Sequence, residues 1–193
     1  MKVGVLAIQG AFAAHVAVLE SLGVAAVEVR RPEHLDGLDG LVLPGGESTT
    51  LSMGLERSGL TGGVRAFVTS GAPVLGTCAG AILLAVECLD GRSDQVQLAA
   101  LDVVARRNAF GRQVDSFETD LDVPRLGQLG LGDGPFHGVF IRAPALERVG
   151  PSVEVLAAHD GTPVAVASGR VVATTFHPEL TADPRLHELV LGR

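Results

Sequence analysis

The stretch "PVLGTCAGAILLA", residues 73–85, joins two apolar runs through a cysteine that stands between two glycines. The first run, over 72–76, has the length of a buried strand, and the second predicts a helix over 79–88. A strand that turns directly into a helix is the repeating unit of doubly wound α/β sheets. This stretch therefore predicts an α/β fold with Cys78 at the tip of a strand-to-helix turn.

The residues before this stretch repeat the alternation. A continuous apolar run rich in β-branched residues predicts a parallel strand buried on both faces at 2–8, and further strands are predicted at 24–31 and 39–46. Helical spacing predicts helices between them, at 12–22 and 47–59. The alternation indicates right-handed crossovers and a flavodoxin-like, three-layer fold, with a central mostly parallel sheet flanked by helices.

The second half has a different pattern, in which short strands follow one another with turn signals between them. The expected strands lie at 96–107, 114–123, 136–143, 153–159, 163–169 and 170–177. Asp160-Gly161 and Ser168-Gly169 predict hairpin turns, 183–191 a last helix, and 124–136 a glycine-rich loop. We expect added antiparallel strands in one domain that covers 1–193.

Composition excludes several classes of protein. Hydrophobic residues make up 47% of the 193 residues, which is enough for a sizeable core. The formal charge of −7 comes without the basic patch that nucleic acid requires, and no apolar run reaches the roughly 18 residues needed to cross a membrane. Two cysteines do not make a disulfide scaffold. We expect a cytoplasmic protein that binds neither nucleic acid nor a membrane.

Cys78 has the setting of a nucleophile, because "GTCAG" (76–80) follows the G-x-nucleophile-x-G pattern of a strained strand-to-helix elbow. The flanking glycines leave room where side chains would collide. The helix N-terminus behind the thiol favours its thiolate and offers N–H groups to an oxyanion. The alternative is a small buried cysteine of the core. We assign Cys88, ten residues later in the same predicted helix, to the core.

A base for that thiol is available in "TTFHPEL" (174–180), after a strongly apolar strand. His177 and Glu179 are two apart, so an extended segment would direct both side chains to the same side. The carboxylate would then hold one imidazole nitrogen while the other faces the thiol. The alternative is an ordinary strand exit with polar groups in water.

A third motif, "LPGGEST" (43–49), places two glycines at a strand end before a helix start. Such a loop presents backbone N–H groups and suits a phosphate or an oxyanion. The carboxyl ends of parallel strands share one edge, so the loop should open beside Cys78 and serve as an oxyanion hole. The alternative is a plain turn with a serine or threonine cap.

These motifs together resemble the class I, triad-type glutamine amidotransferases. The resemblance covers essentially the whole chain and is narrower for the glutaminase subunits of pyridoxal 5′-phosphate synthase. The segments that carry it are "LAIQGAFAAH" (6–15), "LPGGESTT" (43–50), "GTCAGAILLA" (76–85), "RNAFGRQVDSFE" (107–118), "VFIRAP" (139–144) and "FHPELT" (176–181).

The resemblance implies roles for particular residues. Cys78 would be the nucleophile, His177 the base and Glu179 the carboxylate that orients it, with Gly46 and Ala79 at the oxyanion. L-Glutamine would be held by Gly46, Glu47, Ser48, Arg107, Ile141 and Arg142. That Arg107 and Arg142 reach the site is implied by the resemblance alone. It further implies ammonia transfer to a separate synthase subunit, with no cofactor and no metal.

Other readings remain open at this point. The chain could be the glutaminase of another pathway, such as histidine or anthranilate synthesis. It could be a catalytically idle regulatory subunit on the same fold, or a cysteine hydrolase with another substrate. If it feeds a synthase, the Gly45-Gly46 peptide is a candidate gate, because glycine allows the peptide to flip at little cost.

Overall fold

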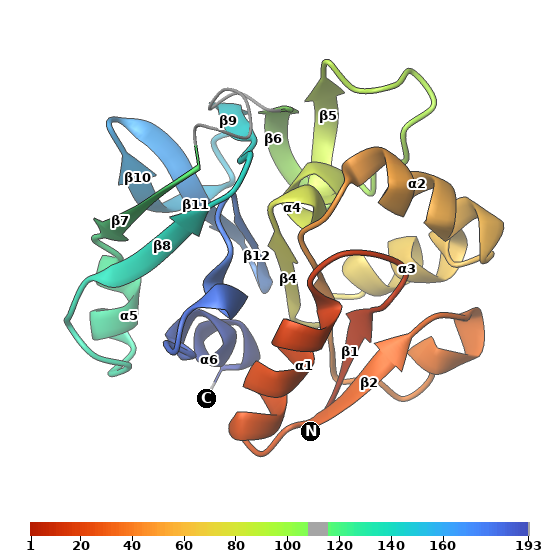
Figure 1. Cartoon of the computed structure of the whole chain (residues 1–193), viewed down its shortest axis with the longest axis horizontal. Coiled ribbons are helices and arrows are strands. Elements are labelled where there is room, and N and C mark those ends of the chain that lie inside the picture. Colours follow the sequence, from red (N-terminus) through yellow and green to blue (C-terminus); the bar gives the residue numbers. More distant parts are fainter. Residues whose placement is uncertain (108–115, 193) are drawn as a thin grey trace.

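A seven-stranded sheet forms the centre of the molecule, as the computed structural model, which describes residues 1–107 and 116–192, shows in Figure 1. Its strands lie in the order β10-β11-β12-β4-β3-β1-β2. Their bounds are β1 Lys2–Leu6, β2 Ala25–Val29, β3 Gly40–Leu43, β4 Val74–Thr77, β10 Glu154–His159, β11 Thr162–Ser168 and β12 Val171–Thr174.

The pairing in this sheet changes from parallel to antiparallel at β12. β2, β1, β3, β4 and β12 are parallel, whereas β11 runs antiparallel to β12 and β10 antiparallel to β11. The predicted flavodoxin-like architecture is therefore confirmed. The predicted hairpins extend the parallel sheet at one edge.

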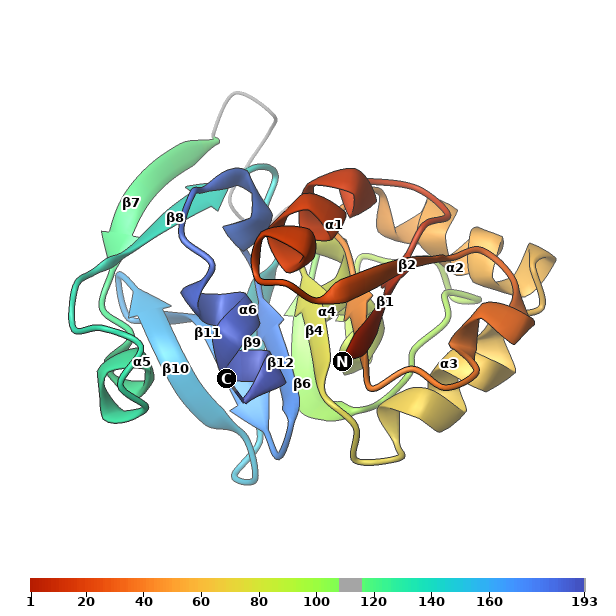
Figure 2. The same cartoon turned by 90° about the horizontal axis from the view of Figure 1, so that it is seen from below.

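Helices cover both faces of the sheet, as the second view shows (Figure 2). One face buries apolar side chains of α2 (Ser48–Arg57), α3 (Thr61–Val68) and α4 (Ala79–Leu84). The other buries those of α1 (Phe12–Ser21), α5 (Pro124–Gln128) and α6 (Arg185–Leu191). A short helical turn, η1, covers Pro32–Leu35. No helix within 1–107 and 116–192 is long and apolar enough to cross a membrane.

Two small sheets complete the fold. β5 (Ala85–Leu89), β6 (Leu101–Arg106) and β9 (Ala145–Val149) form one, and β7 (Phe117–Leu121) and β8 (Phe136–Phe140) form the other. Figure 1 shows β7, β8 and α5 at the opposite end of the molecule from α2 and α3.

Several predicted boundaries were wrong. The helix expected over 79–88 ends at Leu84, and the chain continues as β5, so half-buried Cys88 lies on a strand opposite Ala105. A continuous apolar run suits a buried helix and a buried strand equally, and only the pairing with β6 separates them. The strand expected over 96–107 begins at Leu101, because the residues before it bond to helices: the Val96 N–H donates to Ser52 Oγ in α2 and the Leu98 N–H to the Leu83 carbonyl oxygen in α4.

The sequence did not predict the η1 turn, α3, α5 or β9. α3 escapes notice because "TGGVRAFV" carries two poor helix formers, yet Val64 and Val68 bury one face of it. The expected loop at 124–136 contains α5, and β9 gave no clear alternation. The part of the predicted strand 114–123 and of the "RNAFGRQVDSFE" motif that falls in 108–115 lies outside the described residues.

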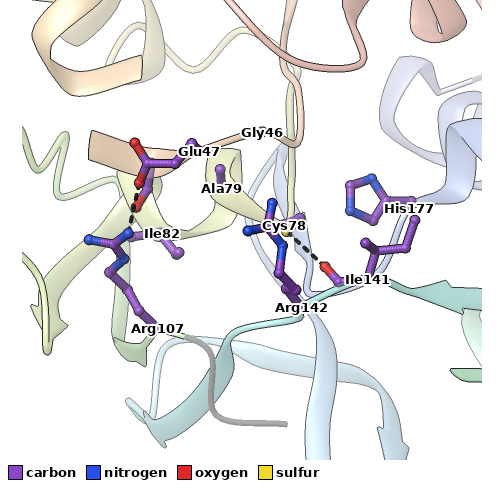
Figure 3. Close-up of a pocket in the computed structure, with 10 residues that line it drawn as sticks. Gly46, Glu47, Cys78, Ala79, Ile82, Arg107, Ile141, Arg142 and His177 are labelled. Carbon is purple, nitrogen blue, oxygen red and sulfur yellow. Dashed lines mark hydrogen bonds and ion pairs between the residues drawn. The ribbon is translucent and has the colours of Figure 1, made fainter. Parts of the chain in front are cut away.

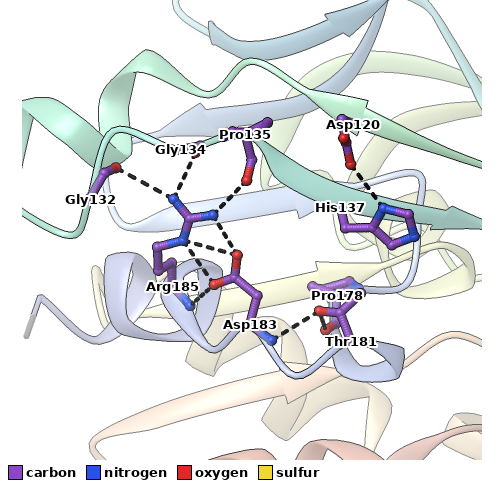
Figure 4. A network of polar contacts seen from close by, with 9 residues as sticks. All are labelled: Asp120, Gly132, Gly134, Pro135, His137, Pro178, Thr181, Asp183 and Arg185. Atoms are coloured by element: carbon purple, nitrogen blue, oxygen red, sulfur yellow. Dashed lines mark hydrogen bonds and ion pairs between the residues drawn. The ribbon is translucent and has the colours of Figure 1, made fainter.

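Arg185, in the first turn of α6, ties the segment before β8 to the C-terminal helix (Figure 4). Its guanidinium donates to the carbonyl oxygens of Gly134 and Pro135, both at 2.8 Å, and pairs with Asp183 at 2.5 Å. It also lies over the ring of Phe136, 5.8 Å from the centroid. Arg185 therefore fixes the start of β8, the strand that leads into Ile141 and Arg142.

We expect Arg185→Met to lower the free energy of unfolding by roughly 1–3 kcal/mol, because the carbonyl oxygens lose their charged donor. Urea denaturation measures the change. Arg31→Met is the matched control, since Arg31 pairs with Glu33 at an exposed site where such a pair contributes at most about 1 kcal/mol. Equal losses in the two variants would contradict the structural role of Arg185.

Candidate active site

One cavity lies at the carboxyl ends of β3, β4 and β12, where the three sequence motifs meet (Figure 3). Every residue that the sequence predicted to bind glutamine or an oxyanion lines this cavity, together with Cys78 and His177. Glu179 does not line it, because it lies behind His177. The lining residues are Gly46, Glu47, Ser48, Cys78, Ala79, Ile82, Arg107, Ile141, Arg142 and His177. Sequence reasoning missed Ile82, which lies one helical turn after Cys78.

Cys78 stands at a strained turn between β4 and α4. Its φ of 48° and ψ of −102° lie in a region that residues with a side chain rarely occupy, at a cost of about 1–3 kcal/mol. Its N–H donates to the Thr174 carbonyl oxygen at 2.8 Å, which ties the turn to β12. A side chain at Gly80 would collide with the carbonyl oxygen of Leu43, and one at Gly76 with Leu84. The glycines are thus required by close packing, as the pattern predicted.

His177 and Glu179 form a buried pair just after β12. The His177 Nδ1 and Glu179 Oε1 atoms are 2.8 Å apart, and the His177 N–H donates to the Val139 carbonyl oxygen at 2.9 Å. The segment is a helical turn, η3 (Pro178–Leu180), and not the extended chain that was expected. Proline at the start of that turn favours helical angles, which fold the carboxylate back onto the imidazole.

The charges of this pair support each other. Burial alone lowers the pKa of His177, but its interactions with Cys78 and Glu179 outweigh burial and raise it to about 10. Burial alone raises the pKa of Glu179. The hydrogen bond from His177, together with the electrostatic effect of the His15 and His177 imidazoles, lowers this pKa below its usual value. The pair can therefore hold an ionised carboxylate against an imidazolium.

The glycine loop after β3 packs directly against the pair and the thiol. A Cβ on Gly45 would lie 3.3 Å from the Cys78 Cβ and would collide with the His177 ring. The Gly45 carbonyl oxygen accepts from the Ala11 N–H at 3.1 Å. In a trans peptide the following N–H, that of Gly46, points in the direction opposite to the Gly45 carbonyl oxygen and therefore away from Ala11. Gln9 Oε1 accepts from the Glu47 N–H at 2.9 Å and holds the far end of the loop.

Glu47 is the N-cap of α2, whereas the alternative considered from the sequence was a serine or threonine cap. Its carboxylate accepts from the Thr49 N–H at 3.0 Å and the Thr50 N–H at 2.7 Å. Partial burial raises the pKa of Glu47, but the hydrogen bond from the Thr50 hydroxyl, these two N–H bonds and Arg107 lower it overall. The Arg107 Nη2 atom lies 2.7 Å from Glu47 Oε1.

Two further groups that line the cavity, the Ser48 hydroxyl and the Ile141 carbonyl oxygen, are available to a ligand. Ser48 Oγ is buried and has no hydrogen-bond partner within the described residues. Arg142 has a φ of 46°, in the left-handed region, and the Ile141 carbonyl oxygen before it lies 4.0 Å from the Cys78 Sγ.

Two buried histidines that the sequence analysis did not single out lie behind Glu179. The Nε2 atom of His15, in α1, lies 3.3 Å from Glu179 Oε2. The Nδ1 atom of His15 lies 2.9 Å from the Nε2 atom of His187, in α6. Burial lowers the pKa of His15 to about 4 and that of His187 to about 3. His15 shares the buried side of α1 with Leu19, and a polar residue on that apolar stripe was the available signal.

Comparison with known families and proteins gives consistent results. The family model described as the SNO glutamine amidotransferase family matches residues 5–192. The chain is 54% identical over 194 residues to the pyridoxal 5′-phosphate synthase subunit PdxT of Herpetosiphon aurantiacus, with 100% of each chain covered. It is 56% identical to PdxT of Mycobacteroides abscessus, covering 97% of this chain and 94% of the relative.

Solved structures show the same likeness. One described as a crystal structure of glutamine amidotransferase has a TM-score of 0.90 at 51% identity, and covers 98% of this chain and 97% of its own. PurLQS from Thermotoga maritima has a TM-score of 0.73 at 15% identity, over 99% of this chain and 97% of its own, a likeness that concerns the fold alone.

We expect the free energy of unfolding to fall as the pH decreases from 6.5 to 5. The buried neutral histidines His15 and His187 take up protons only when the chain unfolds, because their folded pKa values lie below the unfolded value of 6.5. Each contributes a slope of up to about 1.4 kcal/mol per pH unit within that window. Urea denaturation at several pH values measures it, and a flat profile would contradict the neutral pair.

Proposed function

The chain belongs to the SNO glutamine amidotransferase family and is a glutaminase, and we propose that Cys78, His177 and Glu179 are its catalytic triad. In this proposal it hydrolyses L-glutamine to L-glutamate and ammonia through a thioester on Cys78. One observation carries the proposal: the strained thiol, the His177–Glu179 pair and the glycine loop surround a single cavity.

Substrate binding uses the groups at the α2 side of the cavity. The planar guanidinium of Arg107 suits the two oxygens of the α-carboxylate. In the free chain it pairs with Glu47 and donates to the Thr49 hydroxyl at 2.9 Å. Glutamine would therefore exchange one carboxylate partner for another. The Ser48 hydroxyl, which has no partner among the described residues, can donate to or accept from the substrate's polar groups, and the Ile141 carbonyl oxygen can accept from them.

The first chemical step forms the thioester. The Cys78 thiolate attacks the side-chain amide carbon, and the π electrons of the carbonyl move to its oxygen. The N–H groups of Gly46 and Ala79 stabilise this oxyanion, Ala79 because the first N–H groups of a helix have no intrahelical partner. When the carbonyl re-forms, the carbon–nitrogen bond breaks, and His177 donates the proton that releases ammonia.

The second step hydrolyses the thioester. His177, now neutral, takes a proton from water, and the hydroxide attacks the acyl carbon at the same oxyanion hole. The carbon–sulfur bond breaks to give glutamate and the thiolate, which faces the imidazolium again. Glu179 keeps the Nδ1 proton on His177 throughout, so the other nitrogen remains available for both transfers.

The ammonia is supplied to the synthase subunit of pyridoxal 5′-phosphate synthase. Relatives at 52–56% identity over nearly the whole chain carry that name, which favours this partner over the synthases of other pathways. The intact triad favours an enzyme over an idle subunit. We further propose that the chain works as one glutaminase domain in the cytoplasm, where reducing conditions keep Cys78 as the free thiol that it is here.

Cys78→Ala is expected to abolish glutamine hydrolysis without unfolding the chain, because alanine is smaller than the thiol it replaces. Cys88→Ala, the matched control on β5, should keep full activity. Glutamate release in the presence of the synthase subunit measures both, and circular dichroism checks the fold. An active Cys78→Ala enzyme, or an inactive and folded Cys88→Ala enzyme, would refute the assignment.

We expect the isolated chain to be a poor glutaminase and the synthase subunit to raise its turnover by about 100-fold or more. One misdirected oxyanion donor accounts for a factor of that size, and the Gly45-Gly46 peptide is the group that can turn. Glutamine hydrolysis is measured with and without saturating synthase subunit. Equal rates would refute this gate while leaving the triad in place.

A further inference from the structure

His15 is a fully buried histidine that the proposed reaction does not use. It lies on α1, next to the first loop, and its side chain is enclosed between the sheet and the η3 turn. A neutral imidazole without exposure to water needs partners for both ring nitrogens, since an unpaired buried polar group costs about 1–3 kcal/mol. The contacts of the two ring nitrogens therefore indicate the structural role of His15.

The contacts of His15 Nε2 lead to the triad. This nitrogen is 3.3 Å from Glu179 Oε2 and 3.2 Å from the Thr77 hydroxyl, which belongs to the residue before the nucleophile. Glu179 gives its other oxygen, Oε1, to His177. Oε2 is buried and has no hydrogen bond within 1–107 and 116–192, so its 3.3 Å approach to His15 Nε2 is an electrostatic contact, while the hydrogen bond of Nε2 is the one with Thr77. An ionised carboxylate oxygen in that position requires a proton on the nitrogen that faces it.

His187 can match the tautomer of His15 that the Glu179 carboxylate favours. If Nε2 carries the proton, His15 Nδ1 is an acceptor and takes the Nε2–H of His187 at 2.9 Å. The opposite tautomer would place a nitrogen lone pair against Glu179 Oε2. The chain of contacts ends at His187 Nδ1, which is buried and has no partner within the described residues.

We propose that His15 is the positioning residue of the triad: its Nε2–H, bonded to Thr77 and 3.3 Å from Glu179 Oε2, keeps that oxygen in place by electrostatic attraction, so that Oε1 stays aimed at His177, and His187 donates to Nδ1 in the tautomer that this requires. The inference rests on the proposed role of Glu179. The groups that face His15 are Glu179 and His177 after β12 and His187 on α6. His15 carries no charge in this role, because burial keeps its pKa low.

The test compares His15→Leu with His15→Gln, in the full chain with its synthase subunit. Leucine removes the donor, so we expect kcat to fall by roughly 10- to 100-fold with KM within about twofold, as for other outer partners of a site. Without that donor the carboxylate takes up a proton more readily, so the acid limb of kcat against pH moves to higher pH. Glutamine offers an amide N–H at about the distance of Nε2 and should restore most of both.

Val64→Ala is the control for a loss of packing alone. Val64 is buried in α3, on the other face of the sheet, and touches none of these groups. It should lower thermal stability while leaving kcat per folded molecule and the acid limb unchanged. An unshifted acid limb in His15→Leu, or a His15→Gln variant as impaired as His15→Leu, would overturn the proposal.

Nitrogen-15 NMR of the wild-type chain gives a readout that does not depend on turnover. A protonated His15 Nε2 with an unprotonated Nδ1 supports the assignment, and the reverse overturns it. Glu179→Gln separates the two proposals. If it keeps full glutaminase activity, Glu179 has no place in the triad and the proposed triad fails. If it is impaired while His15→Leu is not, only the role of His15 fails.

Discussion

The parallel pairing of β4 between β3 and β12 is the constraint on which the rest of the structure depends. Gly76 stands opposite Leu43 on one side and Ala173 on the other, so the three strands end at the same level. Each strand is followed by one motif: the glycine loop, the cysteine elbow and the His177 turn. Because parallel strands share one carboxyl edge, segments about 30 and 100 residues apart in the chain become neighbours.

Close contact between backbone segments is the second requirement of the site. Gly80 approaches the Leu43 carbonyl, Gly45 approaches His177, and Gly10 approaches the Gly45 carbonyl. At each of these contacts a Cβ would occupy space that another segment already fills. The strained angles of Cys78 are maintained because α4 behind it is buried along its whole length and cannot relax. The packing of the elbow thus keeps the thiol exposed to the cavity at the expense of local stability.

Electrostatics in the site follow from what surrounds each carboxylate. Glu179 is ionised among imidazoles and is closed off from water, so its charge acts on His177 with little screening. Glu47 is half exposed, caps α2 and shares Arg107 with the cavity. The Glu179 carboxylate therefore has a fixed position, which suits a group that orients a base. The Glu47 carboxylate has a partner, Arg107, that it can release to a substrate.

The sequence by itself determined the alternating strands and helices of the first half and the elbow at Cys78, because these depend on local spacing and on a glycine pattern, whereas Arg107 and Arg142 were assigned to the site only through the resemblance to a family. It could not decide where the helix after Cys78 ends, since the apolar run to Cys88 suits helix and strand alike until β6 pairs with it. It predicted an extended "HPE" segment, whereas the chain forms a helical turn that begins at Pro178 and is tied to β8 by the bond from the His177 N–H to the Val139 carbonyl oxygen. Only the tertiary structure brought His15 and His187 together with Glu179, because three elements far apart in the chain enclose them and local periodicity carries no information about such contacts.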